Sequence, residues 1–161
     1  MPLPSTDRRT FLTASLSASA AFAFPMIIPS TAFGANERII TGHIGVGGRG
    51  GGNLRSFLNH AAAVCDVDSS RVARAVKQVE NAGRKCDGYG DFRKLIDRSD
   101  LDAVVISTPD HGHALPTIMA CQAGKDVYCE KPLTLSIVEG RHMVEAARAH
   151  KRIVQTGSQI G

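Results

Sequence analysis

Aromatic residues and excess charge are both scarce in this chain of 161 residues. It has no Trp, two Tyr and six Phe, and its formal net charge at pH 7 is +4. The basic residues are scattered, form no run of like charge and do not alternate with aromatics. Single strands are bound by basic grooves with stacking aromatics, and duplexes by concentrated basic patches. The composition therefore argues against a nucleic-acid partner.

The cysteines and histidines lack the spacing of a metal site. The four cysteines stand at positions 65, 86, 121 and 129, so no C-x-x-C pair occurs. This spacing excludes a zinc ribbon and a thioredoxin-like motif. His111 and His113 supply only two ligands, and no third is spaced to complete a zinc site. We expect no bound metal.

Long apolar runs are absent except near the N-terminus, where a segment without charged residues occurs. Arg8 and Arg9 precede a mildly apolar segment, residues 10–36, that contains no Lys, Arg, Asp or Glu. A positive start followed by a short apolar stretch is typical of a secretory signal, and paired arginines before Phe-Leu resemble the twin-arginine type. Pro25 and Pro29 interrupt the segment, so a stable membrane span is not expected.

Small residues around positions 32–34 suit a signal peptidase. We therefore predict a signal peptide over residues 1–34 and an exported, periplasmic protein. A disordered Ala/Ser tail is the alternative interpretation of this segment.

Strand-like and helix-like segments alternate from residue 38 to residue 157, which we predict to be one domain. Residues 103–106 are apolar on both faces, as in an interior parallel strand. Strands are expected near residues 39–45, 61–65, 103–106, 127–129 and 153–154, and helices ending near 59 and over about 70–82, 114–123 and 136–150. Ser69 or Ser70 can cap the second helix. The alternation predicts a Rossmann-type α/β fold with a doubly wound parallel sheet.

A glycine-rich loop follows the first expected strand. Its residues, in order, are Gly45, Val46, Gly47, Gly48, Arg49 and Gly50, which fit G-x-G-x-x-G in one frame. Between a strand and a helix, this pattern binds the pyrophosphate of a dinucleotide. Gly45 permits the tight turn, Gly47 lets the backbone approach the phosphates, and Gly50 allows close helix packing. Lys and Ser/Thr do not follow Gly50, which excludes a P-loop; a flexible linker is the alternative.

An acidic residue ends the second strand at the distance that this loop requires. Asp66 lies 21 residues after Gly45, where a carboxylate binds the adenosine ribose hydroxyls and disfavours a 2′-phosphate. NAD is therefore favoured, although nearby Arg71 leaves NADP open. Asp68 is the competing acid, and both aspartates could simply cap a turn or the next helix. A methyltransferase also pairs a glycine loop with such an acid, but its loop has a different frame.

Two further motifs follow later strands. The loop from Ser107 through Thr108 and Pro109 to His113 comes after the central strand, so it should reach the cofactor. His113 is expected to stand at the entry of the next helix. The second motif is Glu130-Lys131-Pro132, after the strand at 127–129.

These motifs together resemble those of the Gfo/Idh/MocA oxidoreductases. The resemblance covers about residues 38–157 and rests on the glycine loop, the Thr-Pro-x-x-x-His stretch, Glu130-Lys131-Pro132 and the closing Gly157. It implies an NAD or NADP cofactor, with Thr108, Pro109 and His113 along its path and Glu130 and Lys131 near the nicotinamide.

The resemblance also implies a substrate and a reaction. Lys131 would bind and polarise the reacting hydroxyl of a sugar or polyol during hydride transfer, and Glu130 would orient it. A lysine at a strand end beside an apolar wall can have a lowered pKa; an ordinary surface lysine is the alternative. Family members continue into a C-terminal substrate domain that supplies the acid/base, and we expect that domain to be absent. The alternative function is a catalytically silent nucleotide-binding fragment or interaction module that lacks a substrate domain. As to partners, the sequence leaves a homo-oligomer open.

Overall fold

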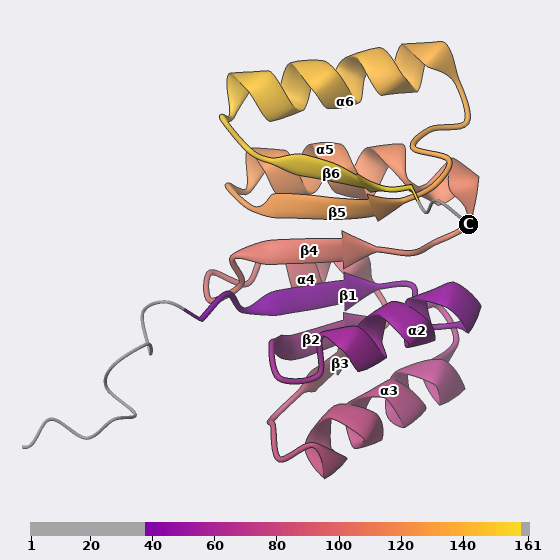
Figure 1. Ribbon diagram of the computed structural model, residues 1–161, viewed down its shortest axis with the longest axis vertical. Coiled ribbons are helices and arrows are strands. Elements are labelled where there is room, and N and C mark those ends of the chain that lie inside the picture. The colour runs from indigo at the N-terminus through magenta and orange to yellow at the C-terminus, as the bar shows by residue number, and fades with distance from the viewer. Residues whose placement is uncertain (1–37, 159–161) are drawn as a thin grey trace, which may run out of the picture. The chain divides into compact units, whose positions relative to one another are not determined.

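The computed structural model describes residues 38–158, and the predicted signal segment, 1–34, lies outside them. Its centre is a six-stranded sheet in the order β3-β2-β1-β4-β5-β6 (Figure 1). Every neighbouring pair is parallel. The strands are β1 (Thr41–Ile44), β2 (Ala61–Cys65), β3 (Asp87–Tyr89), β4 (Ala103–Ile106), β5 (Asp126–Glu130) and β6 (Val154–Gly157). The predicted Rossmann-type parallel sheet is thereby confirmed.

Helices cover both faces of this sheet. They are α2 (Gly48–Ser56), α3 (Ser69–Asn81), α4 (Phe92–Ile96), the short 3-10 turn η2 (Asp110–Gly112), α5 (Ala114–Gln122) and α6 (Ile137–Ala149). In Figure 1, α2 lies in front of the sheet and α4 and α5 lie behind it. No helix among residues 38–158 is long and apolar enough to cross a membrane.

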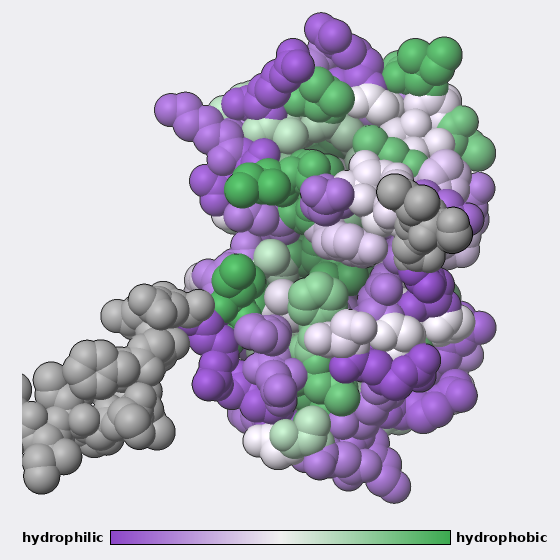
Figure 2. Space-filling view, viewed as in Figure 1, coloured by the Kyte–Doolittle hydropathy of each residue, from purple (hydrophilic) through white to green (hydrophobic). Residues whose placement is uncertain are grey.

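Two apolar cores hold the layers together, one on each face of the sheet. Leu54 of α2 and Val79 of α3 pack on one face with Val64 of β2. On the other face, Leu95 of α4 and Met143 of α6 share a larger cluster with β4 and α5. Over α2 and α3 the outer surface is mostly hydrophilic (Figure 2). Because the two cores hold the helices against the sheet, they fix the positions of the strand ends from which the site is built.

The sequence predicted five strands, and the structure has a sixth. Strand β3 is only three residues long, pairs with β2 alone and is largely exposed. An edge strand needs no apolar run on both faces, so hydrophobic patterning does not reveal it. The start of α3 also differs, because Asp68 caps that helix by accepting the backbone N–H of Ser70. The predicted serine cap was wrong.

The strand order creates a crevice beside β1. The chain leaves β1 towards α2 on one face, whereas β4, its other neighbour, leads towards α5 on the opposite face. Ile44 and Ile106 are register partners at the ends of these two strands. In open α/β sheets, ligands bind where neighbouring strands diverge in this way.

Candidate functional site

The glycine loop turns too tightly for side chains at two positions. Gly45 has φ +81°, and a Cβ there would lie 2.7 Å from the carbonyl oxygen of Ser107. A Cβ on Gly50 would lie 1.8 Å from the carbonyl oxygen of Gly45. Both positions therefore require glycine, and together they bring the first turn of α2 against the end of β1.

The loop leaves the N-terminus of α2 open to an anion. The N-cap residue is Gly47, which has no side chain to bond the first amides, and no acidic residue stands in the first turn. The free N–H groups and the helix dipole attract negative charge. Helix N-termini after glycine loops bind phosphate for this reason.

The buried carboxylate of Asp66 faces the glycine loop. Its Oδ2 accepts the backbone N–H of Val46 at 3.0 Å, and its Oδ1 accepts that of Asp68 at 3.1 Å. The Arg71 guanidinium lies 3.9 Å from Oδ2. Each carboxylate oxygen has a second lone pair that can accept a hydroxyl. Asp68 is thus the helix cap, whereas Asp66 joins β2 to the glycine loop.

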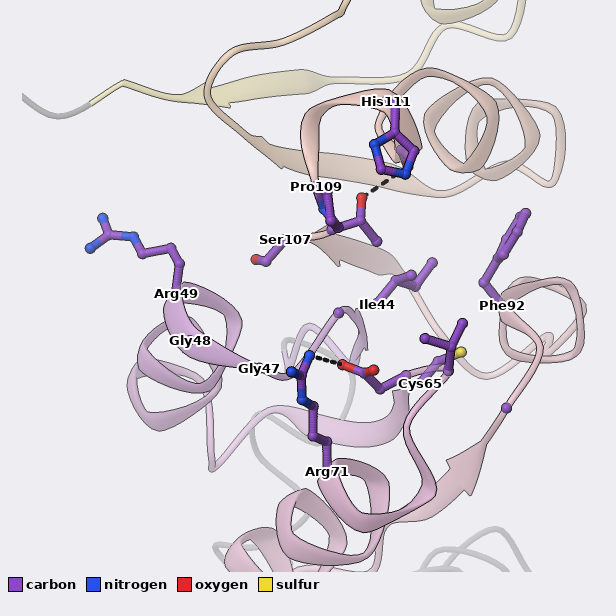
Figure 3. Close-up of a pocket in the computed structure, with 16 residues that line it drawn as sticks. Ile44, Gly47, Gly48, Arg49, Cys65, Arg71, Phe92, Ser107, Pro109 and His111 are labelled. Carbon is purple, nitrogen blue, oxygen red and sulfur yellow. Dashed lines mark hydrogen bonds and ion pairs between the residues drawn. The ribbon is translucent and has the colours of Figure 1, made fainter.

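A cavity of about 510 Å³ opens between these groups and the end of β4. It brings together eight of the predicted site residues: Gly45, Gly47, Gly48, Arg49, Asp66, Ser107, Thr108 and Pro109. Ile44, Cys65 and Phe92 give it an apolar side (Figure 3). Burial, reinforced by the Asp66 charge, raises the pKa of Cys65 to about 11, so this thiol stays neutral. An apolar slot beside a carboxylate suits a flat base attached to a sugar.

A second cavity, of about 350 Å³, adjoins the first at the end of β5. Glu130 and Lys131 line it together with Arg49, Ser107 and Thr108. Lys131 is exposed, and the peptide bond between Lys131 and Pro132 is cis. The cavity beside the glycine loop and the cavity beside Glu130 and Lys131 therefore open at the same end of the sheet, where the parallel strands have their carboxyl ends.

Glu130 is buried and is tied to α2. Its Oε1 accepts Asn53 Nδ2 at 2.9 Å and Arg49 Nε at 3.2 Å. Burial acts to raise the pKa of Glu130, but these two hydrogen bonds and the Arg49 charge outweigh it and lower the pKa. The sequence suggested that Glu130 would orient Lys131. In the structure, the Glu130 side chain accepts hydrogen bonds from two residues of α2 and so joins β5 to that helix.

Two predicted residues, Val46 and His113, stand behind the first cavity rather than in its wall. Val46 gives its backbone N–H to Asp66, while its side chain packs in the core under α2 and α3. His113 is the N-cap residue of α5 and is buried. Its Nδ1 lies 2.7 Å from the carbonyl oxygen of Pro132, and its Nε2 lies 2.8 Å from that of Thr108. His113 thus connects the loop after β4 to the turn after β5.

Residues 40–158 match the model of the Gfo/Idh/MocA oxidoreductases, a family with an NAD-binding Rossmann fold. The chain belongs to this family. The region matched includes the glycine loop, Asp66 and the turn after β5. The family's NAD-binding fold agrees with the apolar cavity, the open helix N-terminus and the buried carboxylate, so this member contains an NAD-binding domain.

The proteins that are similar to this chain include enzymes named for two different reactions. Inositol 2-dehydrogenase of Salmonella typhimurium is 31% identical over 122 residues, covering 72% of this chain and 35% of the relative. Glycosyl hydrolase family 109 protein 2 of Shewanella sp. strain ANA-3 is 33% identical over 172 residues, covering 91% and 38%. The crystal structure of scyllo-inositol dehydrogenase from Lactobacillus casei, with NAD(H) and scyllo-inositol, matches with a TM-score of 0.67 at 27% identity, covering 74% and 36%. The chain spans little more than a third of these relatives.

Two residues that shape this Gfo/Idh/MocA site, Phe92 and Asn53, could not be identified from the sequence motifs. Phe92 belongs to none of the motifs identified in the sequence, yet it lines the first cavity. Asn53 also bonds Ser107 Oγ at 3.0 Å, and so connects α2, β4 and β5. The four-residue spacing between Arg49 and Asn53, one turn of α2, was the available signal that both point towards β5.

Proposed function

We propose that this chain is the cofactor-binding part of an oxidoreductase that transfers hydride between NAD and a hydroxyl-bearing carbon of a polyol or sugar. The observation that carries the proposal is the buried Asp66 carboxylate, bonded to the Val46 amide beside the uncapped start of α2. This arrangement offers acceptors for ribose hydroxyls and donors for a pyrophosphate within one cavity. The names of the inositol dehydrogenase relatives support the polyol class.

The cofactor would follow the sheet edge from one cavity to the other. Its adenosine would lie beside Asp66, and its pyrophosphate at the loop from Gly45 to Gly50. Ser107, Thr108 and Pro109 would line the middle of its path, with His113 supporting them from behind. The nicotinamide, which supplies the hydride chemistry when bound, would then reach the second cavity.

Lys131 would be the catalytic residue of this chain. An ammonium group is a compact, strongly hydrated donor, and it can hydrogen-bond a substrate hydroxyl and stabilise negative charge that develops on its oxygen. Glu130 would act at a distance, by holding α2. We further propose that a substrate domain, such as the rest of the relatives' length would provide, completes the acid/base machinery.

Glycoside hydrolysis is a second candidate function. The relative named glycosyl hydrolase family 109 protein 2 covers 91% of this chain, more than the 72% covered by the inositol dehydrogenase. NAD-dependent glycosidases exist, so an NAD-binding domain does not discriminate between the two reactions. Net formation of NADH from a polyol would identify a dehydrogenase. Release of a leaving group from a glycoside without net NADH would identify a hydrolase.

The binding step can be tested with the 161-residue chain. NADH fluorescence should rise on titration with this protein, because the apolar cavity shields the cofactor from water. No fluorescence change and no heat of binding at millimolar NADH would contradict the proposal. A catalytically silent module would bind NADH but give no turnover even when a substrate domain is supplied.

We also propose that the protein is exported to the periplasm by a twin-arginine signal. The paired Arg8 and Arg9, followed by an uncharged segment, support this proposal. Replacing both arginines with lysine should retain the protein in the cytoplasm, as cell fractionation would measure. Unchanged export of this variant would contradict a twin-arginine route.

A further inference from the structure

The second cavity, at the end of β5, carries more positive than negative charge. Arg49 and Lys131 supply two cations, and Glu130 supplies one carboxylate among the described residues that line it. Because the pKa of Glu130 is lowered, this carboxylate is ionised at neutral pH and offsets one of the two cations. The hydroxyl-bearing residues Ser107 and Thr108 complete the lining. The cavity therefore suits a ligand that has a negative charge as well as hydroxyl groups.

Arg49 has a guanidinium edge that is available to such a ligand. Among the described residues, its guanidinium bonds through Nε, to Glu130 Oε1 at 3.2 Å, and 53% of the side chain is exposed. The two Nη groups are left to a ligand. In Figure 3 the side chain extends away from Cys65 and Phe92, which form the apolar side of the larger cavity. A guanidinium binds a carboxylate through two parallel hydrogen bonds.

The pyrophosphate of the cofactor is the other anion that Arg49 could meet. That anion would lie against the amides of the glycine loop, where the uncapped start of α2 offers donors. The arginine over this loop is Arg71, whose Nη1 is 2.7 Å from the position that a Cβ on Gly47 would occupy. Arg49 is instead held to the end of β5 by Glu130, the neighbour of Lys131 in the sequence. Its position therefore favours contact with the substrate.

We propose that the substrate is a polyol or sugar that carries a carboxylate, which Arg49 binds while Lys131 hydrogen-bonds the hydroxyl that is oxidised. The inference rests on the proposed function and adds a charge to the substrate. In the reaction, the carbon that bears this hydroxyl would lose a hydride to NAD and the hydroxyl would lose its proton, which leaves a keto acid. The carboxylate takes no part in the chemistry and holds the acid in one orientation.

A neutral polyol would use this cavity less fully than an acid. It could bond Lys131, but its hydroxyls are weaker acceptors for the Arg49 guanidinium than a carboxylate is, because hydrogen bonds between charged groups are about twice as strong as neutral ones. Arg49 is half exposed in this chain, so water and salt reduce the gain. We therefore expect the carboxylate to improve binding about fivefold, as an exposed ion pair of good geometry does.

D-gluconate and D-glucitol test the inference, because they differ only in having a carboxylate or a primary alcohol at one end. Each is titrated into the isotope-labelled 161-residue chain, and the NMR shifts of its amides measure affinity at constant ionic strength. The chain is saturated with NADH, whose nicotinamide is uncharged. We expect gluconate to bind about fivefold more tightly than glucitol, and Arg49→Gln to reduce this preference below about twofold. Arg55→Gln is the matched control, since Arg55 is an exposed arginine of the same helix that lines neither cavity.

Loss of the preference in Arg49→Gln alone, with a native amide spectrum and NADH affinity within about twofold of the parent, supports the inference. Equal affinities for gluconate and glucitol, no binding of gluconate, or the same loss in Arg55→Gln would overturn it. A fall in NADH affinity of about tenfold or more in Arg49→Gln would assign Arg49 to the pyrophosphate and overturn it as well. If NADH does not bind the unsubstituted chain, the proposed function itself is wrong, and the preference for gluconate is then measured without cofactor.

Discussion

At the scale of single residues, the Asp66 carboxylate carries the cofactor proposal. Replacing it with Asn keeps an oxygen that can accept the Val46 N–H but removes the negative charge. Hydrogen bonds to charged groups contribute about 1.5–3 kcal/mol, against about 1 for neutral ones. We therefore predict that Asp66→Asn weakens NADH binding about tenfold, and NADPH binding less, in fluorescence titrations.

Asp68→Asn is the matched control for that prediction. It removes a neighbouring charge, and Asn caps a helix as well as Asp does, so α3 should keep its N-cap. NADH affinity should stay within about twofold, because the Asp68 side chain bonds Ser70 rather than the glycine loop. An equal loss in both variants would mean that only the local charge matters, not the position of Asp66.

His43 of β1 makes the stability of the domain depend on pH. Its ring is buried against Phe57 at a centroid distance of 5.9 Å, and its Nδ1 has no hydrogen-bond partner among the described residues. Burial lowers the pKa of His43 from 6.5 to about 4. The folded domain favours the neutral form of His43. The free energy of unfolding is therefore highest above pH 6.5, and it falls as the pH drops towards 4. The loss should approach about 3 kcal/mol.

Denaturant unfolding at a series of pH values checks this prediction. His43→Gln removes the titrating group, so its free energy of unfolding should change less between pH 6.5 and pH 4 than that of the parent chain. The comparison uses the pH slope and not the absolute stability, since the substitution itself disturbs the core. The same slope in both proteins would contradict the role assigned to His43.

Residues fixed by local geometry were predictable from the sequence. Gly45 and Gly50 were identified because a tight turn before a helix requires them at that spacing, and Asp66 because it ends the next strand. Phe92 was not identified as a wall of the cavity. It enters the site only because α4 packs against β1 and β2, which no spacing within one segment reveals.

At the scale of elements, hydrogen bonds from Arg49 and Asn53 connect α2 to the ends of two strands. Glu130 ends β5 and accepts Arg49 and Asn53 from α2, while Asn53 also bonds Ser107 after β4. The helix that would bind the pyrophosphate is thus held to the strand that precedes Lys131. Movement of α2 would change both ends of the proposed cofactor path.

We predict that Glu130→Gln lowers the free energy of unfolding by about 1.5–3 kcal/mol at pH 7, the range for hydrogen bonds to a charged group. The pKa of Glu130 is lowered in the fold, so its stabilising effect is present above its ordinary pKa and is lost as the pH falls through the lowered value. The difference between the two proteins should therefore shrink below about pH 4.5.

Glu145→Gln is the control for this measurement. Glu145 pairs with Arg141 on the exposed face of α6, where an ion pair adds little to stability. The control should unfold with nearly the parent free energy at every pH. A Glu130→Gln protein that does the same would show that the connection between α2 and β5 does not stabilise the domain.

How well a strand could be predicted from the sequence depends on how it is buried in the sheet. Strand β4 was predicted with its observed limits, because an interior parallel strand between β1 and β5 is apolar on both faces. Strand β3 has one neighbour and a Gly at its centre, so its sequence resembles a turn. Its place in the sheet comes from pairing with β2, which only the assembled fold provides.

At the scale of the whole molecule, the two cavities open at one edge of the sheet and meet at Arg49, Ser107 and Thr108. The chain spans little more than a third of its relatives, and the proposed substrate domain would approach the Lys131 end. The family and the cofactor class could be predicted from motifs in order along the chain. The way in which Glu130 ties α2 to β5 could not, because Asn53 belongs to no motif.

The role of Lys131 requires a complete active site, so its test uses a chimera. Residues 38–158 of this chain would replace the matching segment of an inositol dehydrogenase relative, and turnover would be followed by NADH absorbance. We predict that Lys131→Met lowers turnover by about a hundredfold or more, as removal of a group that stabilises developing charge does. NADH affinity should change by less than about twofold, since Lys131 lies outside the cavity proposed for adenosine.

The control in the chimera is Lys85→Met, which removes an exposed lysine just before β3 that lines neither cavity. It should leave both turnover and affinity unchanged. A parallel loss of NADH affinity in Lys131→Met would assign this lysine to cofactor binding rather than to the substrate hydroxyl. Full turnover in that variant would mean that the whole acid/base machinery lies in the substrate domain, with this chain supplying only the nucleotide-binding surface.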